Sequence, residues 1–339
     1  MSKTLTNYIL PLALFPALSV LAFRTIFGHF LASGLALTLK QQCPPIPTSE
    51  NAYQLVYTGV PVVDKRLCGL VTLFHLALSS ETSPFLNYFF GTALPLLAIP
   101  ALESFRRGRH FLLALPVVFG LIMQLMTVGA ILPIYWLIFI TTGSARRRAA
   151  KEKSEISQTH AEGVIVGLAV GAGIPSVCLS LLQDPYVTAV WQFFPLLQFL
   201  AQTGHLLVRR PNANSGYSSI RALYIGIFLL SAATHIGSLL ATNNIGDIKA
   251  LLIPSLAPLT DAQPNFQVRD FLQWDAVFAF GSTLLASLWF AKNAIEVIYI
   301  VLWNSIASVA VGPGAAIAAV ALWRESQLHA FADEKPKSQ

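Results

Sequence analysis

Long apolar segments follow one another along most of this chain, and the charged residues gather in short clusters between them. The longest, residues 273–322, is almost entirely apolar and is interrupted at Lys292-Asn293 and at Gly312-Pro313-Gly314. Only 11% of the residues are charged, whereas a soluble globular domain carries about 25%. So little charge cannot cover a water-facing surface, so we expect an all-α protein with much of its surface facing lipid.

The number of apolar segments predicts a polytopic transmembrane helix bundle. At about 20 residues per span, the 339 residues accommodate about seven to nine spans. We expect one transmembrane helical domain, residues 1–323, and a polar C-terminal tail, residues 324–339. Predicted spans lie at 6–23, 62–80, 84–103, 163–183, 186–207 and 220–242, with two more within 273–322; residues 25–39 either extend the first helix or lie at the membrane surface, and loops are predicted at 40–60, 144–162 and 243–272.

The basic residues predict how the bundle is oriented. The net charge is +6, but the arginines stand beside apolar segments, at 106–109, 146–148 and 209–210, which is typical of loops at a membrane and excludes a nucleic-acid partner. All three clusters point to the cytoplasmic side. Because a single span over residues 111–142 would separate the first two, either this stretch is a hairpin, which Pro116 and Pro133 could produce, or one cluster breaks the rule.

The sequence contains no familiar cofactor or metal signature. Cys43, Cys68 and Cys178 are scattered and show no metal-binding spacing, so we predict three unpaired thiols. There is no GxGxxG, P-loop, HExxH or GxSxG motif, and no DDxxD run that would hold magnesium and a diphosphate. We therefore expect neither a cofactor nor a metal.

Polar residues inside the predicted spans mark candidate site positions. Tyr224 and His235 recur at helical spacing, Gln124 and Tyr135 lie in one apolar run, and Asp64 is eleven residues from His75; Trp274 and Asp275 begin a further row. A charged group at a span centre costs about 2.5–3.5 kcal/mol or more, so such residues normally face the bundle interior. We therefore expect an internal cavity lined by these rows and by aromatic residues such as Phe193, Phe194, Phe278, Phe280 and Trp289.

Structural roles compete with this interpretation. Hydroxyl and amide groups inside spans more often join helices by hydrogen bonds than form sites. Glu103 could pair with Arg106 one turn further on. Asp64 stands beside Lys65 and Arg66, which also permits a solvated role.

Several motifs together resemble a known family. They are Gly59-Val60-Pro61-Val62-Val63-Asp64 leading into Phe74-His75, Glu103 with Arg106, Gln124, Leu132-Pro133-Ile134-Tyr135-Trp136, Arg221-Ala222-Leu223-Tyr224 with Ser231 and His235, and Phe271-Leu272-Gln273-Trp274-Asp275. From about residue 55 to 300, the chain is similar to the integral membrane terpene cyclases of fungal meroterpenoid clusters, the macrophorin- and ascofuranone-type enzymes.

The resemblance implies a function. It implies cyclisation of a farnesyl-type chain attached to a polyketide-derived ring, started by protonating an olefin or an epoxide without metal or cofactor. A carboxyl in an apolar cavity can stay protonated because desolvation disfavours its anion. The candidate acids are Asp64, Glu103 and Asp275, and the candidate substrate-binding residues are Gln124, Tyr135, His235, Trp274 and His75. The expected partners are a lipophilic prenylated molecule and a bilayer, with multi-pass insertion in the endoplasmic reticulum.

Three other functions also fit a polar-lined bundle. A small-molecule transporter or exporter of a secondary-metabolite pathway is the main alternative, although no matched internal repeat is visible. A structural subunit would use the polar rows only to join helices. A membrane O-acyltransferase could use His235 as a base, although the chain is short for that class.

Overall fold

Helices are the regular secondary structure of the described part of the chain. The computed structural model describes residues 4–44, 52–146 and 155–333, and within them no strand is present beyond an isolated bridge between Ser157 and Ser215. Its α-helices are α1 (Leu10–Ala32), α2 (Leu35–Gln42), α3 (Pro61–Ala77), α4 (Ser83–Thr92), α5 (Leu94–Glu103), α6 (Pro116–Met126), α7 (Val128–Thr141), α9 (Gln158–Val166), α10 (Ile174–Leu182), α11 (Pro185–Trp191), α12 (Phe194–Val208), α13 (Tyr217–Leu240), α14 (Ile245–Leu252), α15 (Pro264–Ser287), α16 (Ala294–Ala310) and α17 (Pro313–Asp333). The predicted all-α class is confirmed.

Many of these helices begin at a proline. Proline occupies the first or second position of α3, α4, α6, α11 and α15. There its missing N–H costs no hydrogen bond and its fixed φ already suits a helix. Much of the chain's high proline content therefore starts helices and does not interrupt them.

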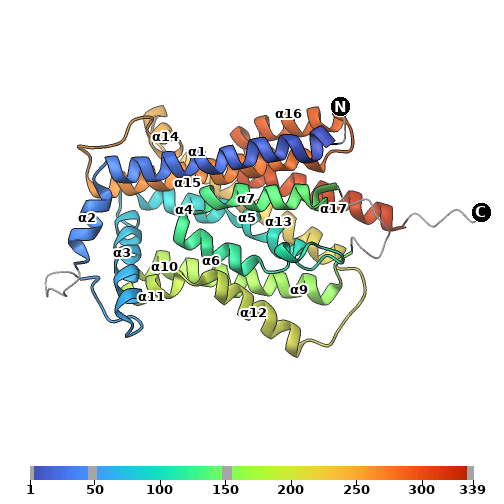
Figure 1. Ribbon diagram of the computed structural model, residues 1–339, viewed down its shortest axis with the longest axis horizontal. Helices are drawn as coiled ribbons and strands as arrows, with labels where there is room; N and C mark the ends of the chain where they lie inside the picture. The colour runs from blue at the N-terminus through green and yellow to red at the C-terminus, as the bar shows by residue number, and fades with distance from the viewer. Residues whose placement is uncertain (1–3, 45–51, 147–154, 334–339) are drawn as a thin grey trace, which may run out of the picture.

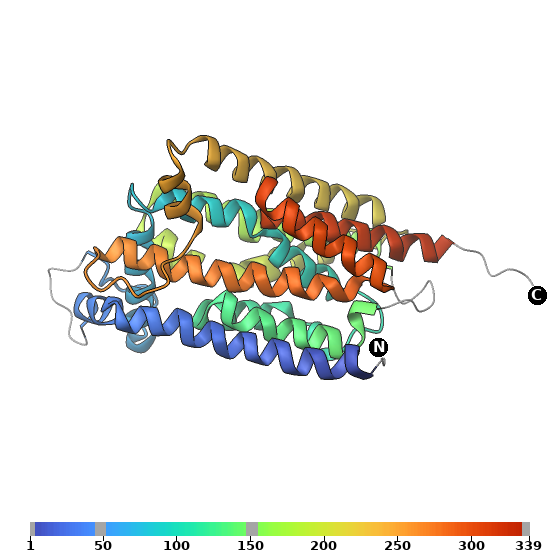
Figure 2. The same cartoon turned by 90° about the horizontal axis from the view of Figure 1, so that it is seen from above.

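The helices form an elongated bundle around α15. α1 and α15 run side by side along its length (Figures 1 and 2), and α15 also packs against α3, α4, α5, α7 and α17. At one end, α3 lies across the direction of the bundle, next to α2 (Figure 1). The two chain ends lie toward the opposite end (Figure 1).

Five helical segments are long and apolar enough to cross a membrane, judged by length and composition. They are Leu5–Ala32, Ser83–Glu103, Gln158–Leu182, Tyr217–Leu240 and Pro264–Phe290. Their number fits a membrane protein, and the predicted seven to nine spans stay a prediction. The first segment runs through residues 25–32, so most of the weaker apolar stretch extends the first helix.

Residues 111–142 form a hairpin. α6 and α7 pack against each other, and the Arg324 guanidinium donates to both Glu103 (2.7 Å) and the Ser144 carbonyl oxygen (3.0 Å). The stretch therefore leaves and returns at the same end of the bundle, which settles the alternative that the arginine clusters raised. The turn is at Thr127, not at Pro116, which starts α6, nor at Pro133, which lies inside α7.

The predicted loop 243–272 is wrong in two places, because α14 occupies Ile245–Leu252 and α15 already begins at Pro264. Polar residues there suggested a solvated segment, but the helix buries them with partners. The Gln267 amide donates to the carbonyl oxygens of Ser33, Leu259 and Ala262 at 2.9–3.0 Å. Asp270 accepts from the Ser255 amide at 2.7 Å and lies 2.8 Å from His29 Nδ1. This start of α15 is thereby fastened to α1 and to the preceding loop.

The prediction of three unpaired cysteines is also wrong. Cys43 and Cys68 form a disulfide with Cα atoms 6.0 Å apart, and Cys178 is free. The bridge joins the residue after α2 to α3 across a separation of 25 residues. Sequence spacing alone carries no information on which helix ends meet, so this pair could not be recognised from it.

The predicted boundary between residues 323 and 324 falls inside α17, which continues to Asp333. Arg324 and Glu325 are 5% and 4% exposed. Arg106 pairs with both Glu103 and Glu325, which anchors the helix in the bundle. Residues 334–339 lie outside the described residues.

Candidate active site

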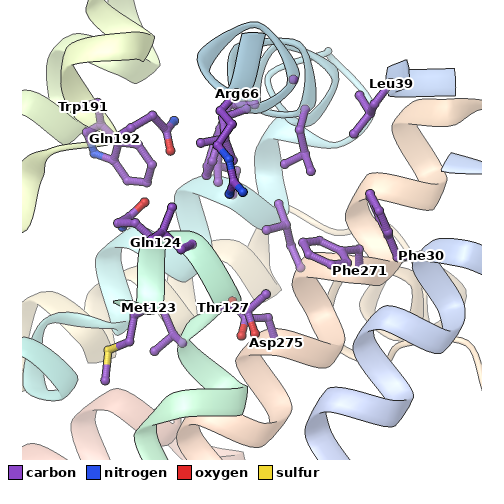
Figure 3. Close-up of a pocket in the computed structure, with 18 of the residues that line it drawn as sticks. Phe30, Leu39, Arg66, Met123, Gln124, Thr127, Trp191, Gln192, Phe271 and Asp275 are labelled. Carbon is purple, nitrogen blue, oxygen red and sulfur yellow. The ribbon is translucent and has the colours of Figure 1, made fainter. Parts of the chain in front are cut away.

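An open cavity of about 430 Å³ lies between the hairpin, α15 and the transverse helix α3 (Figure 3). Most of its wall is aliphatic or aromatic. Its polar lining consists of Lys40, Lys65, Arg66, Gln124, Thr127, Gln192 and Asp275. Asp275 is the only carboxylate among the described residues of this wall.

Asp275 is held by the start of α7. It is the twelfth of the 24 residues of α15 and is 5% exposed. Its Oδ1 accepts a hydrogen bond of 2.5 Å from the Gly129 amide. The first amides of a helix have no partner within the helix, and the helix dipole is positive there. The break between α6 and α7 therefore supplies the donors that orient this carboxyl.

The turn at Thr127 has a backbone conformation that side chains rarely adopt. Its φ of 83° and ψ of 150° lie in a region that is essentially restricted to glycine, where other residues cost about 1–3 kcal/mol. The Thr127 side chain lies beside the Asp275 carboxyl at the inner end of the cavity (Figure 3). Such strain is concentrated at functional positions in proteins.

Gly129 is required for this close approach. A Cβ added to it would lie 2.5 Å from the Asp275 carbonyl oxygen and 2.9 Å from Asp275 Oδ1. Any larger residue would push the start of α7 away from α15. Glycine here therefore serves the contact between hairpin and carboxyl.

Gln124 lies on the same hairpin, about one turn before Thr127. It lines the cavity and faces Gln192 and Trp191 (Figure 3), and its predicted role in substrate binding stays a prediction. Trp191 and the Gln192 amide come from the end of α11 and the residue after it. The hairpin and α11 thus form one polar wall above the carboxyl.

The aromatic residues of the cavity differ from those predicted. Its wall includes Phe27, Phe30, Phe74, Phe89, Phe90, Trp191 and Phe271. None of Phe193, Phe194, Phe278, Phe280 and Trp289 belongs to it. Phe278, Phe280 and Trp289 are buried but do not line this cavity. Phe280, for example, meets Phe89 edge-on at 6.0 Å.

Asp64, a predicted catalytic acid, lies outside the cavity wall. Its Oδ1 accepts from the Thr58 amide and hydroxyl, both at 2.7 Å, and its Oδ2 accepts from the Gly59 amide at 3.1 Å. Hydrogen bonds, first from the Thr58 hydroxyl, hold the pKa of Asp64 below its usual range. An ionised carboxylate that closes a turn before α3 suits a structural role better than proton donation.

Glu103, the second predicted acid, belongs to a buried cluster of charges. Arg106 Nε and Arg324 Nη1 both donate to its Oε1, at 2.5 and 2.7 Å. Glu325 completes the cluster, and all four side chains are at most 6% exposed. In this cluster two arginines balance two carboxylates. The ion pair between Glu103 and Arg106 confirms the predicted pairing.

Two predicted substrate-binding residues, His75 and His235, bond to neighbouring helices. His235 Nδ1 lies 3.1 Å from the Tyr88 hydroxyl, and its Nε2 lies 3.1 Å from the Val309 carbonyl oxygen. His75 Nε2 is 3.2 Å from the Thr188 hydroxyl. Neither histidine belongs to the cavity wall.

Tyr135 and Trp274, also predicted to bind substrate, do not belong to the cavity wall. Tyr135 is fully buried and packs edge-on against Phe119 at 5.4 Å. The Trp274 indole donates to the Ser255 carbonyl oxygen at 3.0 Å. Roles for these two residues and for the histidines stay predictions.

Three cationic side chains of the wall, Lys40, Lys65 and Arg66, were not predicted as site residues. Lys65 and Arg66 were considered only as neighbours of Asp64. For Arg66, one signal was present in the sequence. Arg66 shares helical spacing with Gly69, Leu70 and Leu73, and all four line the cavity. Among the described residues, no group of three or more His, Cys, Asp or Glu side chains is arranged to hold a metal ion.

Comparisons with known proteins place the chain in a family. The sequence profile of the CtvD domain matches residues 11–328. Terpene cyclase ctvD of Aspergillus terreus is 23% identical over 342 aligned positions, which cover 91% of this chain and 97% of the relative. Terpene cyclase ascI of Acremonium egyptiacum is 25% identical over 248, which cover 66% of this chain and 64% of the relative, so this match spans less than two thirds of that protein's length. No solved structure matches. Because the profile covers most of its length, the chain belongs to the CtvD domain family.

Proposed function

We propose that this protein is a membrane-embedded terpene cyclase that closes rings in the farnesyl-type chain of a meroterpenoid, with Asp275 as the general acid. The observation that carries the proposal is a single described carboxylate, buried at the wall of an aromatic cavity and oriented by a helix start. The names of the two relatives support the reaction class. Of the three predicted acids, only Asp275 lies on this wall.

The first step is proton transfer from the Asp275 carboxyl. The Gly129 N–H occupies Oδ1, so Oδ2 is the oxygen that carries the proton in our proposal. The O–H bond of the acid breaks as a C–H bond forms at an olefin carbon, or as an O–H bond forms at an epoxide oxygen. The helix start then stabilises the carboxylate left behind, because its amides and its dipole favour negative charge. This step needs no metal.

Aromatic faces serve the carbocation that follows. Phe89, Phe90, Trp191 and Phe271 line the same cavity as the acid, and their π faces attract a cation without forming a bond to it. The apolar wall also limits capture of the cation by water. At the end the cation loses a proton from carbon to water as a C=C bond forms, and water returns a proton to Asp275, so product and substrate have the same mass.

A bilayer location suits both the chain and such a substrate. Five apolar helical segments are long enough to span it, and a prenylated substrate would enter from lipid. The disulfide between α2 and α3 is typical of an oxidising compartment such as the lumen of the endoplasmic reticulum. The arginine clusters at 106–109 and 209–210 lie toward the opposite end of the bundle, which agrees with a cytoplasmic position for them.

The test is turnover by microsomes that contain the protein. Farnesylated phenols and cyclohexenones, and their epoxides, are incubated in the presence of a chelator, and cyclic isomers of unchanged mass are sought by mass spectrometry. We expect the parent to form such an isomer and Asp275→Asn to form at least about a hundredfold less, as loss of a general acid implies. Asp64→Asn is the control and should remain active. Absence of product from every substrate, or an active Asp275→Asn variant, would refute the proposal.

A further inference from the structure

The cavity has opposite chemistry at its two ends. Asp275 and Thr127 lie at the inner end, whereas Lys40, Lys65 and Arg66 line the end formed by α2 and α3. We propose that this basic end binds an acidic head group, a carboxylate or an acidic phenol or enol, while the apolar tail of the same molecule reaches Asp275. This inference rests on the proposed function and names the substrate class that it accepts.

Arg66 is the central residue of this basic end. Its side chain extends from α3 into the cavity, toward the space between Gln124 and Phe271 (Figure 3). A side chain that served only the lipid surface would extend outward to the head groups. The direction of Arg66 therefore favours a ligand inside the cavity over a lipid outside it.

No carboxylate of the described residues neutralises this group. Lys40, Lys65 and Arg66 take part in none of the ion pairs of the described chain. The carboxylate nearest in sequence, Asp64, is occupied by three hydrogen bonds from Thr58 and Gly59. By contrast, the buried arginines of the α5–α17 cluster are matched by two glutamates. Within the described residues, the basic end therefore keeps a net positive charge that a ligand can meet.

The disulfide holds the two parts of the basic end together. Cys43 follows Lys40 by three residues, Cys68 follows Arg66 by two, and Cys43 itself lines the cavity. The covalent link restricts how far α2 can move from α3. A preorganised pair of helices binds an anion with less loss of conformational freedom.

The experiment compares two ligands that differ only in charge. Purified protein in phosphatidylcholine nanodiscs is titrated with a farnesylated hydroxybenzoic acid and with its methyl ester, and the dissociation constants are measured. A charge-assisted hydrogen bond predicts about tenfold or tighter binding of the acid by the parent. In Arg66→Gln this preference should fall to about onefold to threefold, while Arg66→Lys should keep most of it. The control is Lys249→Gln, an exposed cation on α14 outside this cavity wall, which should keep the full preference.

Two results would overturn the proposal: equal binding of acid and ester by the parent, or an unchanged preference in Arg66→Gln. A third arm adds phosphatidic acid to the nanodisc. If it displaces the acid ligand from the parent, the cations serve lipid head groups and the proposal fails; if the preference persists, the proposal is supported. Because the readout is binding, it does not depend on turnover. A protein that forms no product yet prefers the acid would refute the cyclase assignment alone.

Discussion

Thr127 offers a direct measurement of the strain at the hairpin turn. Thr127→Ala removes the hydroxyl and keeps the unfavourable backbone conformation, whereas Thr127→Gly removes both. The conformation costs a non-glycine residue about 1–3 kcal/mol, and the greater freedom of glycine in the unfolded chain offsets about 0.4–1 kcal/mol of the gain. With φ at 83° and ψ at 150°, we expect the glycine variant to be more stable than the alanine variant by about 1 kcal/mol.

The assay is thermal unfolding of the purified variants in one detergent, followed by turnover. A difference of about 1 kcal/mol corresponds to a melting temperature roughly 2–4 °C higher for Thr127→Gly than for Thr127→Ala. Both variants should lose about tenfold in activity, because both lack the hydroxyl beside the Asp275 carboxyl. A glycine variant that melts at or below the alanine variant would show that the turn is not strained, and the argument that strain positions the site would fail.

Three further predictions test other parts of the structure. Gly129→Ala should lower activity at least about tenfold by separating α7 from α15, since its Cβ would lie 2.5 Å from a backbone oxygen. The control Gly281→Ala on α15, with open space around its Cβ, should be nearly neutral; equal activities of the two variants would contradict this. Glu103→Gln should cost about 3–5 kcal/mol of stability in denaturant unfolding, because it leaves a buried arginine uncompensated. The control Glu162→Gln, whose pair with Arg209 is partly exposed, should leave the unfolding midpoint almost unchanged. Replacing both bridged cysteines by serine should cost about 3 kcal/mol for a separation of 25 residues; the parent should lose the same stability in reductant, and a reductant response in the double variant would contradict the assignment.

The helical class could be predicted from the sequence because the apolar segments are long, follow one another along the chain and contain few charged residues. The hairpin could be stated only as an alternative. Arginine clusters lie on both sides of residues 111–142, so either this stretch is a hairpin or one cluster departs from the positive-inside rule. Hydropathy does not reveal a turn at Thr127, because the segments on both sides of it are apolar. Neither proline of this stretch forms the turn. Proline often marks the end of a helix, but here it does not mark the position of the turn.

The site could be predicted in part. Asp275 and Gln124 lie on the cavity wall, and their roles in catalysis and binding stay predictions. They stand out in the sequence because a polar residue in the middle of an apolar helix must face a partner or a cavity. The same argument cannot distinguish those two outcomes. His235 and His75 face partners and not the cavity: His235 contacts Tyr88 and Val309, and His75 contacts Thr188, all on other helices. Which partner a buried polar group finds depends on helix packing, which spacing along one helix does not contain.

The position of the acid at a helix break has a physical reason. Inside a continuous helix every amide N–H is used by the carbonyl four residues earlier, so no backbone donor is left to orient a neighbouring carboxyl. A free helix start provides such donors, and backbone groups without helical partners are tolerated at membrane depth only where they face protein or a cavity. In the hairpin, α7 begins beside Asp275, so its first amides face this carboxyl. Gly129 has no side chain, which lets its amide reach the carboxyl at 2.5 Å. Two short helices thus do what one long span could not, because the interruption itself supplies the hydrogen-bond donors of the proposed acid site.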